Sequence, residues 1–300
     1  MSTNTISVSD ASAKRKYKKR GPVAEVFHRL RKNKGAILGA IIILILILMA
    51  IFADVIYDYE TDIIGQNLKQ RFIKPCWEHP FGTDNLGRDL FARVVYGTRS
   101  SLPVGFGAVS VSLVLGMITG AFAGFFGGKV ENVIMRIMDI FAAVPNILMA
   151  IALVSAMGVS TLSLVTALGI ASMPSFARIT RAAVLSVRNQ EFVESAKAIG
   201  LSNTEIIFKH IIPNCLSPII VQCTLRMGSA IIAASSLSYL GLGVPPPMPE
   251  WGSLLSAGRD FIRDNGYLTI FPGLAIMVTV VAFNMLGDGL RDAMDPKLKK

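Results

Sequence analysis

The chain has 300 residues, of which 52% are hydrophobic and 17% are charged, with a formal net charge of +10. A soluble domain usually carries about 25% charged residues, so this composition argues against a water-soluble globular protein. Ten lysines and arginines lie within residues 1–35, ahead of the first long apolar segment, which is typical of a cytoplasmic membrane anchor and not of a nucleic-acid-binding surface.

The N-terminal part predicts a basic tail followed by one membrane span. Residues 1–13 are rich in serine, threonine and alanine and are expected to be disordered, and residues 1–35 form a cytoplasmic tail suited to contact anionic lipid. The first transmembrane helix is predicted at 36–56, because the 18 residues from Ala36 to Ala53 have no polar side chain. This segment is too long, and starts too late, for a cleaved signal peptide.

An extracytoplasmic loop, residues 57–101, is expected next. Within 88–99 four apolar residues share one helical face, with Arg88, Asp89 and Arg93 away from it; the four are Leu90, Phe91, Val94 and Val95. The same pattern recurs in 252–264. Both segments are therefore predicted to be helices that lie on the membrane surface or cap a cavity.

A core at 97–288 is expected to hold five more transmembrane helices. The uncharged stretch 140–177 is too long for one crossing, and Gly158 marks a tight turn within it. The predicted spans lie within 100–128 and at 137–157, 161–177, 216–240 and 267–287. A cytoplasmic tail, 289–300, completes an all-α membrane protein of six transmembrane helices.

The distribution of charge predicts that both termini are cytoplasmic. Inner segments hold 21 lysines and arginines against nine acidic residues, whereas outer segments hold eight against ten. Lysine and arginine favour the cytoplasmic side, and tyrosine and tryptophan favour the interfaces. The aromatic residues agree, since those at the helix ends fall on the outer side: Tyr57, Tyr59, Trp77, Tyr96, Tyr239, Trp251 and Tyr267.

Three features inside the spans are candidates for packing or transport. Glycines recur every fourth residue at Gly116, Gly120 and Gly124, a pattern typical of close helix packing. Arg226, with Gln222 one turn earlier, falls near the middle of a span and lines a pathway, forms an internal hydrogen bond or extends its charged end toward the membrane interface. Asp139 lies near an inner helix end, where a carboxylate can be interfacial.

The inner segment 178–214 is ordered enough to dock a partner. Gln190–Ile199 predicts a helix with Phe192, Val193, Ala196 and Ile199 on one face, and Gly200 bends the chain. A capping box at Ser202–Glu205 then opens a second helix, which carries Ile206, Ile207 and Phe208 and stops near Pro213. We name residues 190–213 the elbow; it would suit a cytoplasmic partner.

No catalytic, metal or nucleotide site is expected. Gly127-Gly128-Lys129 lacks the spacing and the hydroxyl residue of a phosphate loop. The three histidines, His28, His79 and His210, fall on different sides of the predicted membrane and cannot meet at one metal ion. The cysteines, Cys76, Cys215 and Cys223, have no metal-binding spacing.

Several motifs resemble one family. Glu194-Ser195-Ala196, Gly200 and His210-Ile211-Ile212-Pro213 resemble the EAA motif of ABC-importer permeases, with Ser195 in place of an alanine and Ile212 in place of a leucine. Further motifs are similar to those of the C-type permeases for dipeptides, oligopeptides and nickel: 79–84 with 87–89, 237–243, 249–252 and 283–296.

This resemblance implies a type I importer permease fold in a bacterial or archaeal plasma membrane. It implies a related B-type permease as partner, two cytoplasmic ATPase subunits that bind ATP and magnesium, and an extracytoplasmic solute-binding protein. The ATPase-coupling residues would be Glu194, Ser195, Ala196, Gly200, His210 and Pro213. The chain itself would then be a transport subunit and not an enzyme.

The resemblance favours peptides as substrate, with nickel chelates, glutathione-like compounds and opines as alternatives. A self-contained secondary transporter is a more distant alternative, because it would predict an inverted repeat and acidic residues near mid-membrane. A membrane enzyme is disfavoured by the separation of the histidines.

Overall fold

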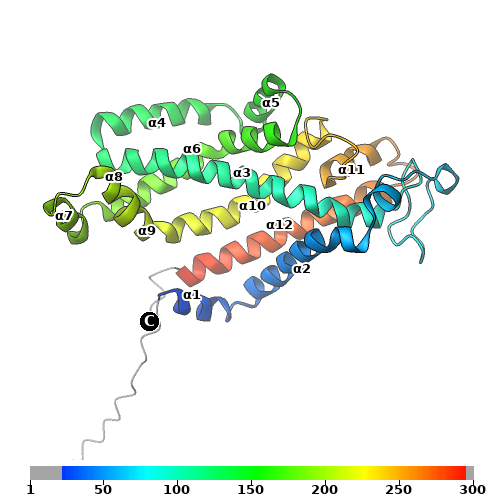
Figure 1. Ribbon diagram of the computed structural model, residues 1–300, viewed down its shortest axis with the longest axis horizontal. Helices are drawn as coiled ribbons and strands as arrows, with labels where there is room; N and C mark the ends of the chain where they lie inside the picture. The colour runs from blue at the N-terminus through cyan, green and yellow to red at the C-terminus, as the bar shows by residue number, and fades with distance from the viewer. Residues whose placement is uncertain (1–21, 295–300) are drawn as a thin grey trace, which may run out of the picture.

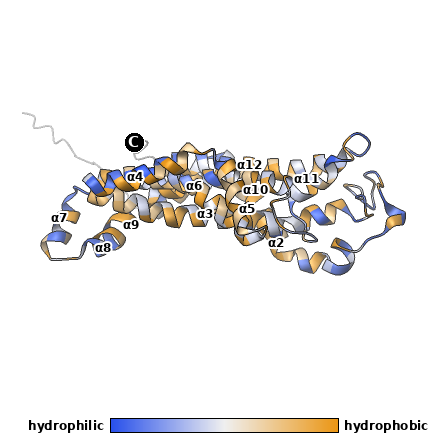
Figure 2. Ribbon diagram, turned by 90° about the horizontal axis from the view of Figure 1, so that it is seen from above, coloured by the Kyte–Doolittle hydropathy of each residue, from blue (hydrophilic) through white to orange (hydrophobic). Residues whose placement is uncertain are grey.

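The computed structural model describes residues 22–294, with side chains from residue 25 onward. Its helices run mostly along one long axis, and the two ends of this bundle look different (Figure 1). Helices of the bundle are hydrophobic along their middle, whereas both ends are hydrophilic (Figure 2). Predicted tail residues 1–21 and 295–300 lie outside the described residues.

Five helices are long and apolar enough to cross a membrane. They are α2 (Lys34–Ile56), α3 (Leu90–Phe126), α6 (Thr161–Val187), α10 (Leu216–Tyr239) and α12 (Tyr267–Met294). A sixth span is possible if the bent pair α4 (Gly128–Ala143) and α5 (Asn146–Met157) is taken as one. The prediction of a helical bundle with six apolar spans is confirmed to this extent.

The span predicted at 137–157 is not one continuous helix. α4 begins at Gly128, directly after α3, and the α4–α5 pair bends by 90° at its break. Pro145 stands in this break, and proline restricts the residue before it, here Val144, to extended backbone. The expected tight turn before α6 is present, since Gly158 has φ +84° and Ser160 caps α6.

The prediction of a separate surface helix at 88–99 is also wrong. Leu90 to Arg99 form the first turns of α3, which continues as one helix through Pro103. Asp89 caps its start by accepting a hydrogen bond from the Ala92 amide. Arg93, expected on an exposed face, is buried, because the loop that precedes α3 folds over it.

Packing centres on a parallel pair, in which contacts of the α3 glycines from Gly116 to Gly124 advance along α6 from Met173 to Val184, and on an antiparallel group around α12. α3 packs along α6, and α12 packs against both α2 and α10. α11 (Trp251–Arg259) packs on α12, α10 and the start of α3, so the second predicted amphipathic segment caps the bundle. α1 (Pro22–Leu30) crosses the end of α12.

The two bundle ends carry the remaining short elements. At one end are α7 (Glu191–Ala198), α8 (Asn203–Glu205), the π-helical turn η3 (Ile206–Ile211) and α9 (Ile212–Asn214), which make up the elbow. At the other end, residues 57–89 contain the short helices η1 (Tyr59–Ile63) and η2 (Leu68–Gln70). We name residues 57–89 together with α11 the loop cap.

Candidate functional site

Gly200 bends the elbow by ending α7 in a left-handed turn. Its φ is +82°, the Gly200 amide donates to the Lys197 carbonyl at 3.0 Å, and the Leu201 amide donates to the Ala196 carbonyl at 3.2 Å. This pair of bonds is a Schellman motif, in which glycine is favoured because it adopts positive φ without steric cost. The direction of the chain after α7 is therefore fixed by the backbone at Gly200.

A capping box starts the second half of the elbow. The Ser202 hydroxyl accepts from the Glu205 amide at 3.3 Å, and the Glu205 carboxylate accepts from the Ser202 amide at 3.3 Å. Hydrogen bonds from the Lys209 ammonium and from Ser202 hold the pKa of Glu205 below its usual range. The carboxylate is thus ionised near neutral pH and the cap is complete.

Apolar side chains fasten the elbow to the bundle. Val193 and Ala196 of α7 are buried. They pack with three buried isoleucines that follow the bend, Ile206, Ile207 and Ile211. The same cluster includes Ala121, Val184 and Ile219 of the long helices. The predicted apolar face was right for Val193 and Ala196. Ile199, predicted on that face, is 75% exposed, and Phe208 of the second half is 43% exposed.

The outward side of the elbow offers unpaired polar groups. Glu194 and Ser195 are exposed, and within the described residues the Glu194 carboxylate has no hydrogen bond or ion pair. His210 is half-buried, and its backbone carbonyl accepts from the side-chain Nδ2 of Asn214 at 2.7 Å. Pro213 is exposed within α9. Ile199 is exposed as well, so this side of the elbow presents both polar and apolar groups that the described residues do not cover.

A small cavity of about 70 Å³ lies between α3, α5, α6 and α10. Arg226 of α10 lines it, and its guanidinium donates to the Ser175 hydroxyl of α6 at 2.9 Å. The polar residues Asn146, Ser172 and Ser229 also line it. Gln222 is half-buried on the same helix, one turn earlier, but does not line this cavity.

The glycine stripe of α3 faces α6. A Cβ placed on Gly116 would come within 2.8 Å of the Met173 carbonyl oxygen, and one on Gly124 would lie 2.9 Å from the Val184 Cβ. Gly120 meets the Ala177 backbone in the same way. Larger side chains would push the two helices apart.

At the opposite end, the loop cap holds a buried charge cluster that sequence reasoning missed. The Asp84 carboxylate accepts from the Arg88 Nε and the Arg93 Nη1, both at 2.7 Å, and from two backbone amides. The Asp84 and Arg93 side chains are each 8% exposed. His79 lies nearby, with its Nδ1 2.7 Å from the Asp89 carboxylate. Helical periodicity in 88–99 gave no signal for this cluster, because the partner lies in the preceding loop.

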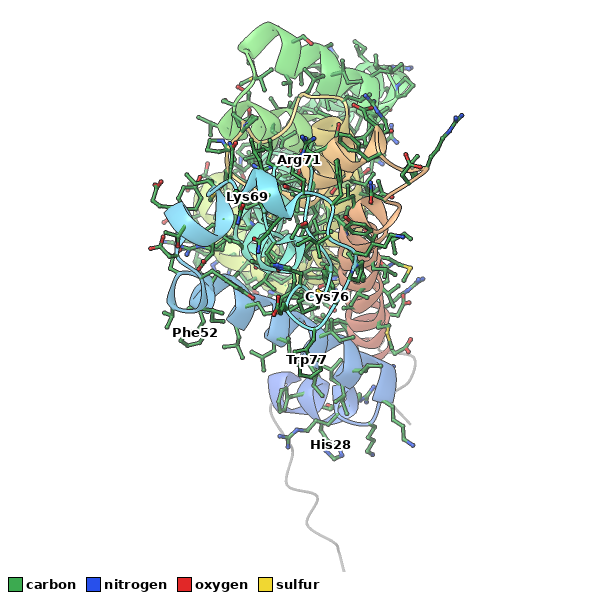
Figure 3. All side chains as sticks on the ribbon, turned by 90° about the vertical axis from the view of Figure 1, so that its right-hand side faces the viewer. His28, Phe52, Lys69, Arg71, Cys76 and Trp77 are labelled. Carbon is green, nitrogen blue, oxygen red and sulfur yellow. The ribbon has the colours of Figure 1, made fainter. Side chains whose placement is uncertain are left out.

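The loop cap is also tied to α3 through α11. Trp251 is fully buried and its Nε1 donates to the Val94 carbonyl at 2.9 Å. Glu250 is 1% exposed and caps α11 by accepting from the Gly252 and Ser253 amides at 3.0 and 2.9 Å. Seen from this end, Lys69, Arg71, Cys76 and Trp77 lie on the covering loop (Figure 3).

Comparison with known proteins decides the family. Residues 113–300 match the family described as binding-protein-dependent transport system inner membrane component, and residues 21–75 match the N-terminal TM domain of oligopeptide transport permease C. The chain belongs to this permease family. Its multiple apolar helices are consistent with an inner membrane component.

Relatives of this permease align over nearly the whole chain. It is 49% identical to the dipeptide transport system permease protein DppC of Alkalihalophilus pseudofirmus, over 93% of this chain and 91% of the relative. It is 40% identical to the di/tripeptide transport system permease protein DppC of Pseudomonas aeruginosa, over 93% of each. Identity to the glutathione transport system permease protein GsiD of Escherichia coli is 44%, over 93% of this chain and 92% of that one.

Solved structures show the fold of the permease. An inward-facing structure of the MetNI methionine ABC transporter aligns with a TM-score of 0.56 at 17% identity, covering 69% of this chain and 98% of that one. An amino acid ABC transporter crystal structure aligns with a TM-score of 0.52 at 15% identity, covering 67% and 94%. The expected ABC importer permease fold is confirmed.

Proposed function

We propose that this permease is the C-type subunit of an ABC importer and that it transports dipeptides and short oligopeptides. The observation that carries the proposal is the alignment of 93% of the chain with permeases named for dipeptide and di/tripeptide transport. A related B-type permease completes the pathway, and a solute-binding protein delivers the peptide. Selectivity then depends largely on that separate binding protein.

Two ATPase subunits bind the cytoplasmic elbows of the permease pair. Support comes from the exposed Glu194 and Ser195, and from Ile199, which is 75% exposed at the end of the bundle. ATP and magnesium are held by those subunits, since Gly127-Gly128-Lys129 lacks the form of a phosphate loop. Closure of the ATPases moves the elbows and switches the pathway from outward- to inward-facing.

Arg226 and Gln222 belong to the pathway in this proposal. The elbow continues into α10 through two residues, Asn214 and Cys215, so a displacement of the elbow reaches Arg226 along one chain segment. Both termini are cytoplasmic, as the charge distribution predicts, and the complex resides in a bacterial or archaeal plasma membrane. The relatives named above are all from bacteria.

Uptake by the reconstituted complex tests the proposal. The permease is purified with its partner subunits, placed in proteoliposomes with the binding protein, and supplied with a radiolabelled dipeptide. We expect uptake that requires ATP, the ATPases and the binding protein. Uptake by this chain alone would instead indicate a secondary transporter.

Glutathione transport is a second candidate, favoured by the 44% identity to the Escherichia coli glutathione permease. Mass spectrometry of the ligand that co-purifies with the binding protein separates the two. A dipeptide or tripeptide without a γ-linkage supports the first candidate, whereas glutathione supports the second.

A further inference from the structure

Arg226 is an ionisable group at an energetically costly depth. It is the single charged residue of α10 and lies ten residues after Leu216, about 15 Å along the helix at 1.5 Å per residue. The hydrocarbon layer of a membrane is about 30 Å thick. A charged residue at the middle of a span should therefore face protein or a cavity and should find a compensating partner.

Within residues 22–294, Arg226 finds no charged partner. Its recorded hydrogen bond goes to a neutral hydroxyl, that of Ser175. Three arginines of other long helices do pair with carboxylates: Arg93 with Asp84, Arg178 with Asp139 and Arg181 with Glu131. The positive charge of Arg226 is thus left for a group that this part of the chain does not supply.

The cavity beside Arg226 has the size and donors for a carboxylate. About 70 Å³ is several times the roughly 10–15 Å³ that one water needs on this measure. The Asn146 amide and the Ser172 and Ser229 hydroxyls on its wall can all donate hydrogen bonds. Ser229 and Asn146 are exposed, so the site is reached from the surface of this chain. A guanidinium binds a carboxylate through two parallel hydrogen bonds.

We propose that Arg226, with Asn146, Ser172 and Ser229, binds the terminal carboxylate of the peptide during its passage through the membrane. This inference rests on the proposed function and adds the chemical group that the permease recognises. Every free peptide carries this carboxylate whatever its side chains are, so the site would serve a broad range of peptides. A blocked, amidated peptide would lose the interaction.

Transport of a dipeptide and of its C-terminal amide tests this site. Uptake of both is measured in the reconstituted complex for the wild type, Arg226→Met and Arg226→Lys, with one binding protein throughout. The binding protein's own preference then cancels when the acid-to-amide uptake ratio is compared between permeases. Thr224→Val on the same helix is the control, because the Thr224 hydroxyl is satisfied by the Ile220 carbonyl.

We expect Arg226→Met to lower uptake of the free acid at least about tenfold and to reduce the acid-to-amide ratio, since a hydrogen bond to a charged group is lost. Arg226→Lys should retain an intermediate ratio, and Thr224→Val should match the wild type. An unchanged ratio in Arg226→Met, with ATPase subunits still co-purifying, would overturn the proposal. So would loss of assembly in both Arg226 variants, which would place the arginine in contact with the partner permease.

These outcomes are distinct from failure of the proposed function itself. If the wild-type complex takes up neither the dipeptide nor the amide, the substrate class is wrong. If it takes up both and the ratio does not respond to Arg226, the substrate class stands and the carboxylate site is wrong.

Discussion

The loop cap and the elbow lie at opposite ends of the bundle and are stabilised in different ways (Figure 1). In the loop cap, charged groups are buried and paired with one another, since the Asp84 carboxylate binds both Arg88 and Arg93. In the elbow, burial is apolar, through residues such as Val193 and Ile206, while Glu194 stays exposed and unpaired within the described residues.

The carboxylate of the loop cap has its hydrogen-bond partners within the described residues, whereas the exposed carboxylate of the elbow does not. A buried carboxylate that accepts four hydrogen bonds has little capacity left for a partner. The Glu194 carboxylate, exposed and without a hydrogen bond within the described residues, retains that capacity. The structure of the loop cap should therefore depend more on its own side chains than on partner subunits. The outward side of the elbow should instead depend on a partner subunit to complete its interactions.

Labelling of reporter cysteines tests whether the two regions lie on opposite sides of the membrane. With the native cysteines removed, a cysteine at Glu78 in the loop cap should react with an impermeant maleimide in intact cells. A cysteine at Asn203 in the elbow should react only after the cells are permeabilised. Both side chains are exposed in the structure, so burial would not prevent labelling. The reverse pattern would place the elbow outside and refute the coupling role.

Asp84→Ala should have the largest effect on stability. It leaves Arg93 buried without its carboxylate, and removal of one partner from a buried ion pair costs about 3–5 kcal/mol. Thermal unfolding of the purified complex measures the loss. Asp264→Ala, at an exposed residue near α12, is the matched control and should unfold like the wild type. Equal unfolding of the two variants would mean that the cluster contributes nothing.

Gly200→Val should abolish uptake while the spans still insert. Valine in the left-handed region is disfavoured by roughly 1–2 kcal/mol or more, so the elbow would change its direction after α7. Transport-stimulated ATP hydrolysis and co-purification of the ATPase report the defect. Gly200→Asn should keep much of the activity, because asparagine accepts positive φ. Normal coupling in Gly200→Val would show that the elbow is a passive linker.

Glu194→Ala should weaken the attachment of the ATPase without abolishing it. An interfacial hydrogen bond is typically worth about 0.5–3 kcal/mol, so the dissociation constant of the ATPase should rise roughly two- to a hundredfold, and the complex should come apart at a correspondingly higher concentration on dilution. Dilution of the detergent-solubilised complex followed by size-exclusion chromatography measures this. Glu60→Ala removes an exposed carboxylate from the loop cap and should leave attachment unchanged.

Much of the fold could be predicted because the apolar spans are set by composition and length. The start of α2 was predicted to within two residues of Lys34, and the turn at Gly158 was recognised from its glycine. The predictions were wrong where tertiary contacts determine where a helix begins or bends. α3 extends beyond the apolar window, back to Leu90, because the loop cap covers its polar first turns. The bend at Pro145 occurs inside an uninterrupted uncharged segment, so hydropathy could not reveal it.

The elbow was predictable for a different reason from the rest of the site. Gly200 and the Ser202–Glu205 box are local signals, read within a few residues, and the structure shows both turns. Contacts between distant residues left no such signal. Asp84 with Arg93 and Arg226 with Ser175 each depend on how the chain returns on itself, which periodicity does not encode.

The single helix α3 connects the loop cap with the end of the bundle that carries the elbow. Its 37 residues form a rod about 55 Å long, nearly twice the thickness of the hydrocarbon layer. One end carries Arg93 and the Val94 carbonyl within the loop cap. Near the other end the Gly124 carbonyl accepts from the Arg188 guanidinium at 2.9 Å, just ahead of the elbow. For a rod of this length, a tilt of about 5° about one end would move the other end by about 5 Å.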